Sequence, residues 1–406
     1  MSRFTYTAEK GDGEVYKGVA EARDRFELYE IVRREGGRLV SMSEESTQKT
    51  LSLSYWNAKL STVKEYDKVL FARNLGAMLS AGLALARALA VLERQSKNVK
   101  LSSIIGEVAG SVRRGDTLHV ALSKFPKTFS HLFVAMVRAG EEGGDLSGAL
   151  QTVADQMERM YQLKKKIRSA LIYPAVIVFA IFGIGTFMMI NVVPTLAQTF
   201  EEMNAELPRS TQLVIGVSNF LVEYTVVALG LFITTVALLY TAARTAGGKR
   251  AFDFLFLRMP LVGVLVREVN AARTSRTLAS LLASGVDVLG SLEITGEVVQ
   301  NSYFKGIIAE AEQRVRQGEP LSVAFVRRED LYPAFVGEMM AVGEETGNSA
   351  EMLKRLAVYY EEEVDRKTKD MSTIIEPFLM LIIGGAVGFF AISMISPIYS
   401  LSNNIG

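Results

Sequence analysis

The residue types that most often perform chemistry are scarce in this chain. Its 406 residues include two histidines, His119 and His131, and no cysteine, which excludes disulfides, thiolate metal sites and cysteine nucleophiles. Neither histidine belongs to a His-Glu-x-x-His pattern, and the phosphate-binding and nucleophile-elbow motifs are missing. We therefore expect no catalytic residue, no metal site and no cofactor, and a structural or surface role for both histidines.

Glycine-bounded pairs of acids are the best candidates for a special site. The sequence Gly140-Glu141-Glu142-Gly143-Gly144 has a counterpart in Gly343-Glu344-Glu345-Thr346-Gly347. These carboxylates could bind a cation or the basic groups of a partner. The alternative is a helix that stops, turns and restarts, with the acids favoured at the N-terminus of the new helix. We favour this structural interpretation, and a salt bridge within the bundle for Arg73 and Arg276.

These patterns belong to an internal repeat with a constant offset of 203 residues, the difference between positions 276 and 73. The offset relates identical residues without a gap: Gly82 and Gly285, Gly140 and Gly343, Glu141 and Glu344, Gly144 and Gly347, Pro174 and Pro377. Leu75 and Leu79 continue a helical spacing of apolar residues. The repeat predicts two copies of one module, a helical bundle followed by a membrane helix.

Three long apolar segments predict membrane-spanning helices over residues 169–193, 224–243 and 374–397, because about 20 such residues cross the hydrocarbon core. Basic residues at 164–168 precede the first segment, and others at 244–250 follow the second. Such flanks mark the cytoplasmic side of a membrane. We therefore expect both bundles in the cytoplasm and the C-terminus outside.

The fold class expected is mainly α, with two duplicated cytoplasmic bundles, three transmembrane helices and a small N-terminal α+β unit. In that unit, Phe4–Ala8 and Val15–Val19 predict strands around a turn at Gly11–Gly13, and a helix follows over Ala22–Arg34. The expected domains are the α+β unit (1–42), a linker (43–63), the first bundle (64–168), the first span (169–193), an outer, periplasmic loop (194–223), the second span (224–243), the second bundle (244–373), the third span (374–397) and an outer tail (398–406).

Several motifs together resemble the inner-membrane platform proteins, which are the F protein of type II secretion and its type IV pilus counterpart. The resemblance covers essentially the whole chain. It rests on the repeat, the Leu-x-x-x-Leu-x-x-Gly sequences ending at Gly82 and Gly285, and the Pro174 and Pro377 positions. It also rests on Arg258-x-Pro260-x-x-Gly263, Leu207-Pro208-x-x-Thr211 and Phe4-x-Tyr6-x-Ala8 followed by Gly18.

The resemblance implies a non-enzymatic role in the bacterial inner membrane. Such a protein couples a separate cytoplasmic hexameric ATPase to extension or retraction of a pilus or pseudopilus. The implied partners are that ATPase, pilin or pseudopilin subunits, other inner-membrane assembly proteins, membrane lipid and further copies of the chain. The residues leave open the choice between pilus and secretion system.

Two other function classes are weighed against this one. A small transporter would need a polar pathway, and the three spans offer little to line it. A membrane-anchored enzyme would need the missing nucleotide motif, whereas a membrane-anchored scaffold would not. With 45 basic and 44 acidic residues, the chain lacks the basic excess of nucleic-acid-binding proteins.

Overall fold

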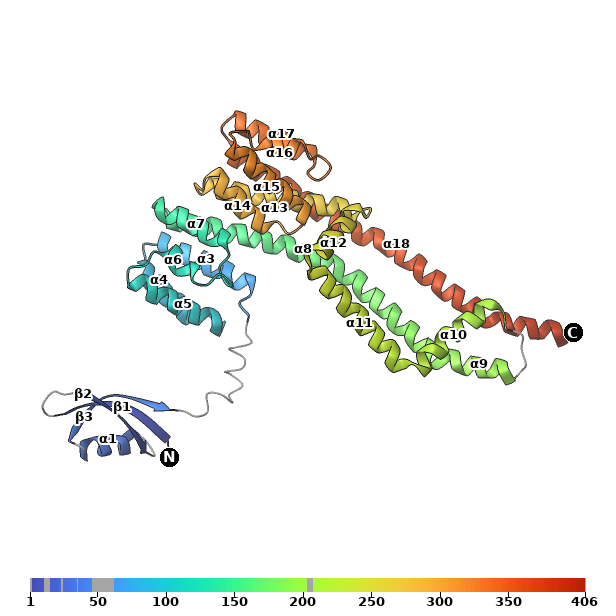
Figure 1. The fold of residues 1–406 in the computed structure, drawn as a ribbon, viewed down its shortest axis with the longest axis horizontal. Coiled ribbons are helices and arrows are strands. Elements are labelled where there is room, and N and C mark those ends of the chain that lie inside the picture. Colours follow the sequence, from blue (N-terminus) through green and yellow to red (C-terminus); the bar gives the residue numbers. More distant parts are fainter. Residues whose placement is uncertain are drawn as a thin grey trace. The chain divides into compact units, whose positions relative to one another are not determined.

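The computed structural model describes residues 2–10, 15–22, 25–34, 36–45, 62–202 and 207–405. It forms two compact units, residues 1–63 with 93–105, and residues 64–92 with 106–406. The predicted turn at Gly11–Gly13 and most of the predicted linker lie outside the described residues. Figure 1 labels the helices and strands.

The N-terminal unit contains the predicted sheet and helix. Strands β1 (Ser2–Lys10), β2 (Val15–Ala22) and β3 (Gly37–Glu45) form an antiparallel sheet in the order β2-β1-β3, and α1 (Arg25–Arg34) packs on it. Alternating apolar residues place Tyr6, Ala8 and Ala22 in a small core with Val32 of the helix.

Gly18 has a steric role in this sheet. It pairs with Tyr6 across β1 and β2, and a Cβ at this position would lie 2.6 Å from the tyrosine ring. A side chain at position 18 would therefore displace the buried ring. This contact explains why an aromatic residue and a glycine accompany each other in the N-terminal motif.

Two series of six helices repeat in the same order. The first contains α3 (Glu65–Ser80), α4 (Leu85–Gln95), α5 (Val99–Arg113), α6 (Leu118–Ser123), α7 (His131–Glu142) and α8 (Leu146–Phe187). The second contains α13 (Val262–Ala283), α14 (Val288–Val298), α15 (Ser302–Arg316), α16 (Ser322–Val326), α17 (Ala334–Glu345) and α18 (Ser349–Ile405). Both ends of α14, α15 and α17 lie 203 residues after those of α4, α5 and α7 (for α14, 288 − 85). The predicted mainly helical, duplicated fold is confirmed.

Among the residues that the structure describes, three helices are long and apolar enough to cross a membrane, as predicted. They span Leu146–Glu202, Thr225–Arg244 and Ser349–Ile395. The first comprises α8, the π-helical turn η1 (Met188–Val192) and α9 (Val193–Glu202), the second is α11 (Thr225–Arg244), and the third lies within α18. Large apolar side chains on them are exposed, including Phe179 at 81% and Val226 at 84%. Such surfaces suit a lipid environment, and the chain is a membrane protein.

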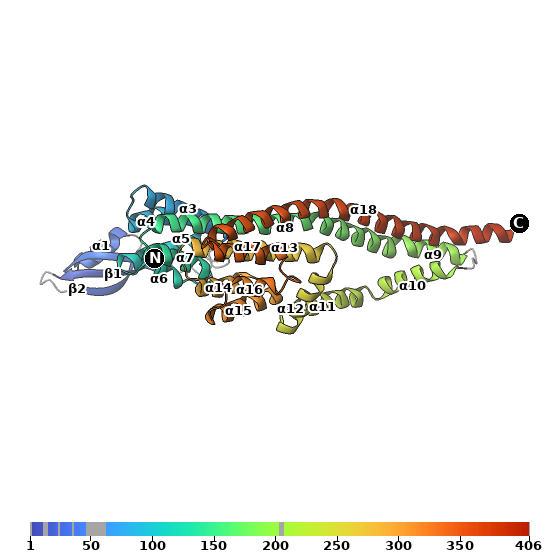
Figure 2. The same ribbon diagram turned by 90° about the horizontal axis from the view of Figure 1, so that it is seen from above.

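No helix ends where the sequence placed the inner boundaries of the first and third spans. Helix α8 passes through Ser169, and α18 passes through Thr373 and Ile374. Figures 1 and 2 show each of the two as one long helix. Pro174 and Pro377 therefore lie inside helices, where each removes one backbone hydrogen bond. The bundle and the span of each repeat share one helix.

The segment predicted as an outer loop is also largely helical. It contains α9 and α10 (Arg209–Glu223), whereas residues 203–206 lie outside the described residues. After α11, the short helix α12 (Ala246–Arg258) leads into the second repeat.

The two bundles fill equivalent core positions with different chemistry. In the first, Phe71 and Phe129 pack with ring centroids 5.5 Å apart. Their counterparts are Thr274 and Tyr332 (332 − 129 = 203), whose hydroxyl oxygens lie 2.7 Å apart in a buried hydrogen bond. Burial raises the pKa of the Tyr332 phenol, which keeps it neutral.

Candidate functional site

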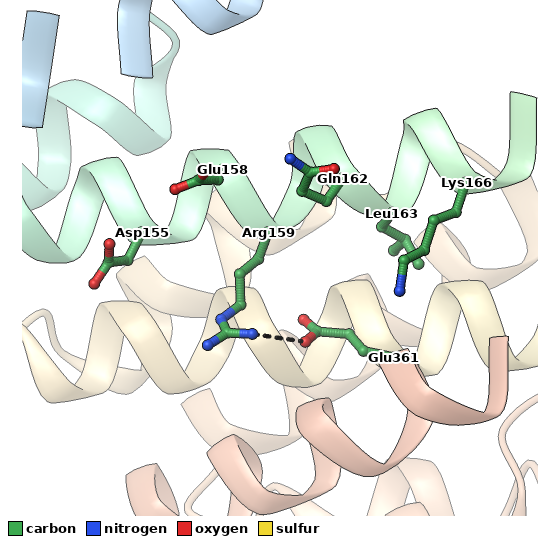
Figure 3. A pocket seen from close by; sticks show the side chains of 7 residues that line it. All are labelled: Asp155, Glu158, Arg159, Gln162, Leu163, Lys166 and Glu361. Carbon is green, nitrogen blue, oxygen red and sulfur yellow. Dashed lines mark ion pairs between the residues drawn. The ribbon is translucent and has the colours of Figure 1, made fainter. Parts of the chain in front are cut away.

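The long helices of the two repeats meet along a charged contact that we call the seam. Helices α8 and α18 pack side by side next to the bundles (Figure 2). A cavity of about 500 Å³ lies there, and Figure 3 shows the residues that line it: Asp155, Glu158, Arg159, Gln162, Leu163 and Lys166 of α8, with Glu361 of α18. The seam therefore places ionisable groups of one repeat against the other.

Each repeat contains the same ion pair beside the seam. The guanidinium of Arg276 donates through Nε and Nη2 to the two carboxylate oxygens of Glu361, both at 2.8 Å. In the first repeat, Arg73 donates to Glu158, which lies 203 residues before Glu361 (361 − 158). The expected salt bridge within each bundle is confirmed. In the second repeat, this two-point contact between planar groups fixes the angle between α13 and α18.

The two ion pairs differ in their surroundings. The side chains of Arg276 and Glu361 are 8% and 15% exposed, against 40% and 31% for Arg73 and Glu158. Helix α8 covers the second pair, and its Arg159 Nη1 lies 3.9 Å from Glu361 Oε2 (Figure 3). The second pair thus takes part in the contact between repeats.

Further contacts join the repeats. Lys166 Nζ of α8 lies 2.8 Å from Asp365 Oδ1 of α18. Gln156, which is 2% exposed, accepts a hydrogen bond from Ser280 Oγ of α13 at 2.9 Å, and its amide donates to Thr277 Oγ1 at 3.4 Å. A buried amide must keep its partners, so this contact sets the register of α8 on α13. Sequence inspection missed Gln156, because the repeat does not preserve it.

Glu141 and Glu344 are helix caps. Glu141 accepts from the backbone N–H groups of Leu118 at 2.7 Å and His119 at 3.0 Å, at the start of α6. Glu344 accepts in the same way from Leu321 and Ser322 at the start of α16. The expected partner was the helix that follows each acid. Instead, each acid reaches back about 23 residues to a shorter helix, while Asp145 caps α8 through Gly148 N–H at 2.8 Å.

His119 joins the first of these caps. Its Nδ1 lies 2.7 Å from Glu141 Oε2, whereas His131 Nδ1 lies 3.3 Å from Glu297 at the surface. Both histidines therefore contact acids of the bundles. The carboxylate oxygens of Glu141 and Glu344 thus accept hydrogen bonds from backbone N–H groups of the bundles, which supports the structural role of the repeated acids.

The repeated glycines divide into two kinds. Six follow helix ends with positive φ angles, which favour glycine: Gly82 at 83°, Gly115 at 101°, Gly144 at 79°, Gly285 at 84°, Gly318 at 84° and Gly347 at 69°. Gly140 and Gly343 instead allow helices to approach closely. A Cβ at Gly140 would lie 2.1 Å from Ala149 Cβ, and one at Gly343 would lie 2.9 Å from Ser349 Cα.

Helix α10 connects the far ends of the first and third spans. Thr211 donates to the backbone carbonyl of Ser393 in α18, and Ser218 donates to that of Met189 in η1. Leu207 packs beside an apolar cluster at the same place. The Leu207-Pro208-x-x-Thr211 motif therefore has a physical basis, because it starts α10 and anchors that helix to the third span.

Comparisons with known proteins agree with this duplicated architecture. The family model described as type II secretion system (T2SS), protein F, matches residues 71–194 and 274–397. The two matches are offset by 274 − 71 = 203 residues, the offset of the helices and of the paired arginines.

Similar curated proteins cover most or all of the chain. A type IV pilus assembly protein PilC of Thermus thermophilus is 38% identical over 82% of each chain. PilC of Myxococcus xanthus is 30% identical over 100% of this chain and 96% of its own. The type II secretion system protein F of Pseudomonas aeruginosa is 30% identical over 100% of both. With two matched domains and these full-length relatives, the chain belongs to the family of type II secretion system protein F.

Proposed function

We propose that this protein is a non-enzymatic inner-membrane platform that couples a cytoplasmic hexameric ATPase to extension or retraction of a type IV pilus or a type II secretion pseudopilus. The observation that carries the proposal is the continuity of α8 and α18, each of which runs from a packed bundle into a span. The names of the relatives, which refer to pilus assembly and type II secretion, support it.

The mechanism follows from this geometry. A hydrogen-bonded helix transmits displacement along its axis, so a force on a bundle reaches the membrane through α8 or α18. Lys166 and Asp365 tie the two helices together before they separate into their spans. The bundles would receive the force from the ATPase, and the spans would pass it to pilin or pseudopilin helices. No step in this transfer needs a reactive side chain.

The proposal includes an orientation in the membrane. Basic residues at 164–168 and 244–250 would face the cytoplasm with both bundles (64–168 and 244–373). Residues 194–223 and the C-terminal tail would face the periplasm. Because the chain has no cysteine, Asn403→Cys provides a unique label site. It should react with a membrane-impermeant maleimide in cells with a permeable outer membrane, and reaction only after lysis would contradict this orientation.

Partners and oligomeric state belong to the same proposal. The exposed apolar faces of the spans are suited to lipid, to pilin helices and to further copies of the chain. Other inner-membrane assembly proteins complete the expected machine. A homo-oligomer would present several identical bundles to a hexameric ATPase.

Deletion of the gene in the native host tests the function. We expect loss of surface fibres or of secreted proteins, with recovery when the intact gene is returned. The phenotype also decides between pilus and secretion system. Normal fibres together with normal secretion would overturn the proposal. ATP hydrolysis by the purified protein alone would contradict its non-enzymatic part.

A further inference from the structure

A second cavity lies in the second repeat, where the bundle meets the start of the first span. Its volume is about 620 Å³. Its apolar wall includes Ile167 and Leu171 of α8, Phe256 of α12 and Met371 of α18. Its polar residues include Lys249, Asp253, Asn270, Arg273, Gln300 and Asn301. The lining is therefore amphiphilic, with cations and amides alongside side chains that continue toward the membrane segment.

Two basic residues, Lys249 and Arg273, line this cavity with one acid, Asp253. Asp253 already accepts the backbone N–H of Ser302 at 2.8 Å. Arg273 also lines a neighbouring cavity of about 250 Å³ with Lys68, Lys164 and Glu65, and Glu65 is paired with Lys164 at 2.9 Å. Among the described residues, the Arg273 guanidinium has neither a hydrogen bond nor an ion pair. An anion would provide the missing partner.

Arg273 is half-buried, and burial of a charge that has no partner costs free energy. Burial lowers the pKa of Arg273, and the charge of Glu65 opposes this shift only in part. Burial likewise lowers the pKa of Lys68 beside it. The two cations therefore sit in surroundings that disfavour uncompensated positive charge.

Helix α12 forms part of the wall and has the composition of a helix that lies on a membrane surface. It begins two residues after α11, a candidate span. Phe254, Leu255 and Phe256 are 46%, 53% and 46% exposed, and Arg258 lies over the Phe254 ring at 4.9 Å. Exposed aromatic residues next to cations are typical of interfacial helices. The cavity is therefore placed to exchange ligands with the bilayer.

We propose that this cavity binds one anionic phospholipid per chain, with the phosphate beside Arg273 and Lys249 and an acyl chain against Leu171 and Phe256. Basic pockets beside membrane helices recognise anionic headgroups in this way. The site is single because the repeat does not preserve it. The counterpart of Arg273 is Leu70, and that of Asn270 is Asp67.

Lipid titration of the full chain tests the proposal. The purified protein would be delipidated in detergent and titrated with dioleoyl phosphatidylglycerol or dioleoyl phosphatidylcholine, and bound lipid would be counted by native mass spectrometry. Lys249→Gln combined with Arg273→Gln removes two charges from the site. Lys305→Gln combined with Arg327→Gln removes two exposed charges of the same bundle that do not line the cavity. Melting temperatures would verify that both variants fold.

We expect one tightly bound phosphatidylglycerol on the wild-type chain and at least about tenfold weaker binding in the cavity variant, since each basic residue near a lipid headgroup contributes on the order of 1 kcal/mol. The control variant should bind as the wild type does. Equal affinity for phosphatidylcholine, or equal weakening in the control, would overturn the proposal.

Two further arms identify the source of the phosphate and protect against a variant that fails to fold. Inorganic phosphate and glycerol 3-phosphate are tested as competitors. If either compound displaces the lipid at a concentration similar to that of the lipid, and also stabilises the protein, the ligand is a soluble phosphate. The lipid assignment then fails. A phosphatidylglycerol with a photoreactive acyl chain should label wild-type peptides around Leu171 and Phe256. Labelling confined to other spans would overturn the proposal.

Discussion

Glu141 and Glu344 each satisfy two backbone donors that their helices leave unpaired. Replacement of Glu141 by alanine should lower the free energy of unfolding by about 1–3 kcal/mol, because two partly buried N–H groups lose their acceptor. Glu344→Ala should act similarly. Urea-dependent proteolysis of the full chain in detergent measures the change.

The neighbouring acids provide matched controls for these substitutions. Glu142 makes an exposed i,i+4 pair with Arg138, and Glu345 is exposed. Alanine at either position should change stability by about 0.5 kcal/mol or less. Equal effects of Glu141→Ala and Glu142→Ala would show that the cap does not stabilise the bundle.

Tyr332 and Thr274 form a buried pair that can be tested by a double-mutant cycle. Tyr332→Phe or Thr274→Val alone should cost about 1–3 kcal/mol, since each leaves one buried hydroxyl without its partner. The double variant should be more stable than the sum of the single effects predicts. The first repeat supports this expectation, because Phe71 and Phe129 fill the same positions without a hydroxyl. Strict additivity in urea unfolding would contradict the pairing.

Tyr332 should also make stability depend on alkaline pH. Burial raises the pKa of its phenol in the folded chain, whereas an unfolded tyrosine ionises near pH 10. Because the folded pKa is the higher one, the stabilisation is complete below about pH 10 and declines as the pH rises above it. Between about pH 8 and about pH 10.5, the wild type should therefore lose more stability than Tyr332→Phe. An equal loss would show that the phenol does not contribute.

At the scale of helices, Gly140 and Gly343 should tolerate alanine poorly. A methyl group at Gly140 overlaps Ala149 of α8, and one at Gly343 meets the backbone of α18. Each substitution should cost about 1–3 kcal/mol through overpacking. Gly306→Ala in α15 is the control, because open space surrounds its Cβ, and it should stabilise the helix by about 0.5–1 kcal/mol. The unfolding midpoints of the three variants decide the comparison.

The sequence predicts helix ends well where a single residue sets them. Gly82 and Gly285 end helices because of their own backbone freedom, and their common offset predicts both helix ends. The targets of Glu141 and Glu344 could not be predicted, because each acid contacts a helix about 23 residues earlier only after the bundle has folded. The recurrence of these acids marked them as structurally important without indicating their partners.

The position where a chain enters the membrane and the position where a helix ends follow different physical rules. This explains why the predicted boundaries of the spans and of the outer loop differ from the observed helix ends. The charge pattern at 164–168 marks where the chain should leave the cytoplasm, yet backbone hydrogen bonding continues through it, so α8 has no break there. The acidic segment 194–223 is polar enough to be read as a loop, but its hydroxyl and apolar residues form α10 and pack on α18. The contact across the seam also depends on tertiary structure, since Gln156 and Lys166 meet partners more than 100 residues away.

At the scale of the whole molecule, we expect the seam to determine whether α8 and α18 move together. Lys166 and Asp365 join them at 2.8 Å, and both side chains are partly exposed, at 47% and 27%. Such a pair contributes at most about 1 kcal/mol to stability. Its role in the proposed function is alignment, so charge changes at these positions should affect assembly more than folding.

A charge exchange tests this role. Lys166→Asp places two carboxylates together at the seam and should abolish or strongly reduce fibre formation or secretion in the native host, while changing the unfolding free energy by about 1 kcal/mol or less. Adding Asp365→Lys restores opposite charges across the seam and should recover most of the activity. Lys165→Asp, at an exposed position outside the seam lining, controls for loss of a basic residue near the membrane. Full activity of Lys166→Asp, or a double variant as defective as the single one, would show that the two helices do not depend on this contact to act as one unit.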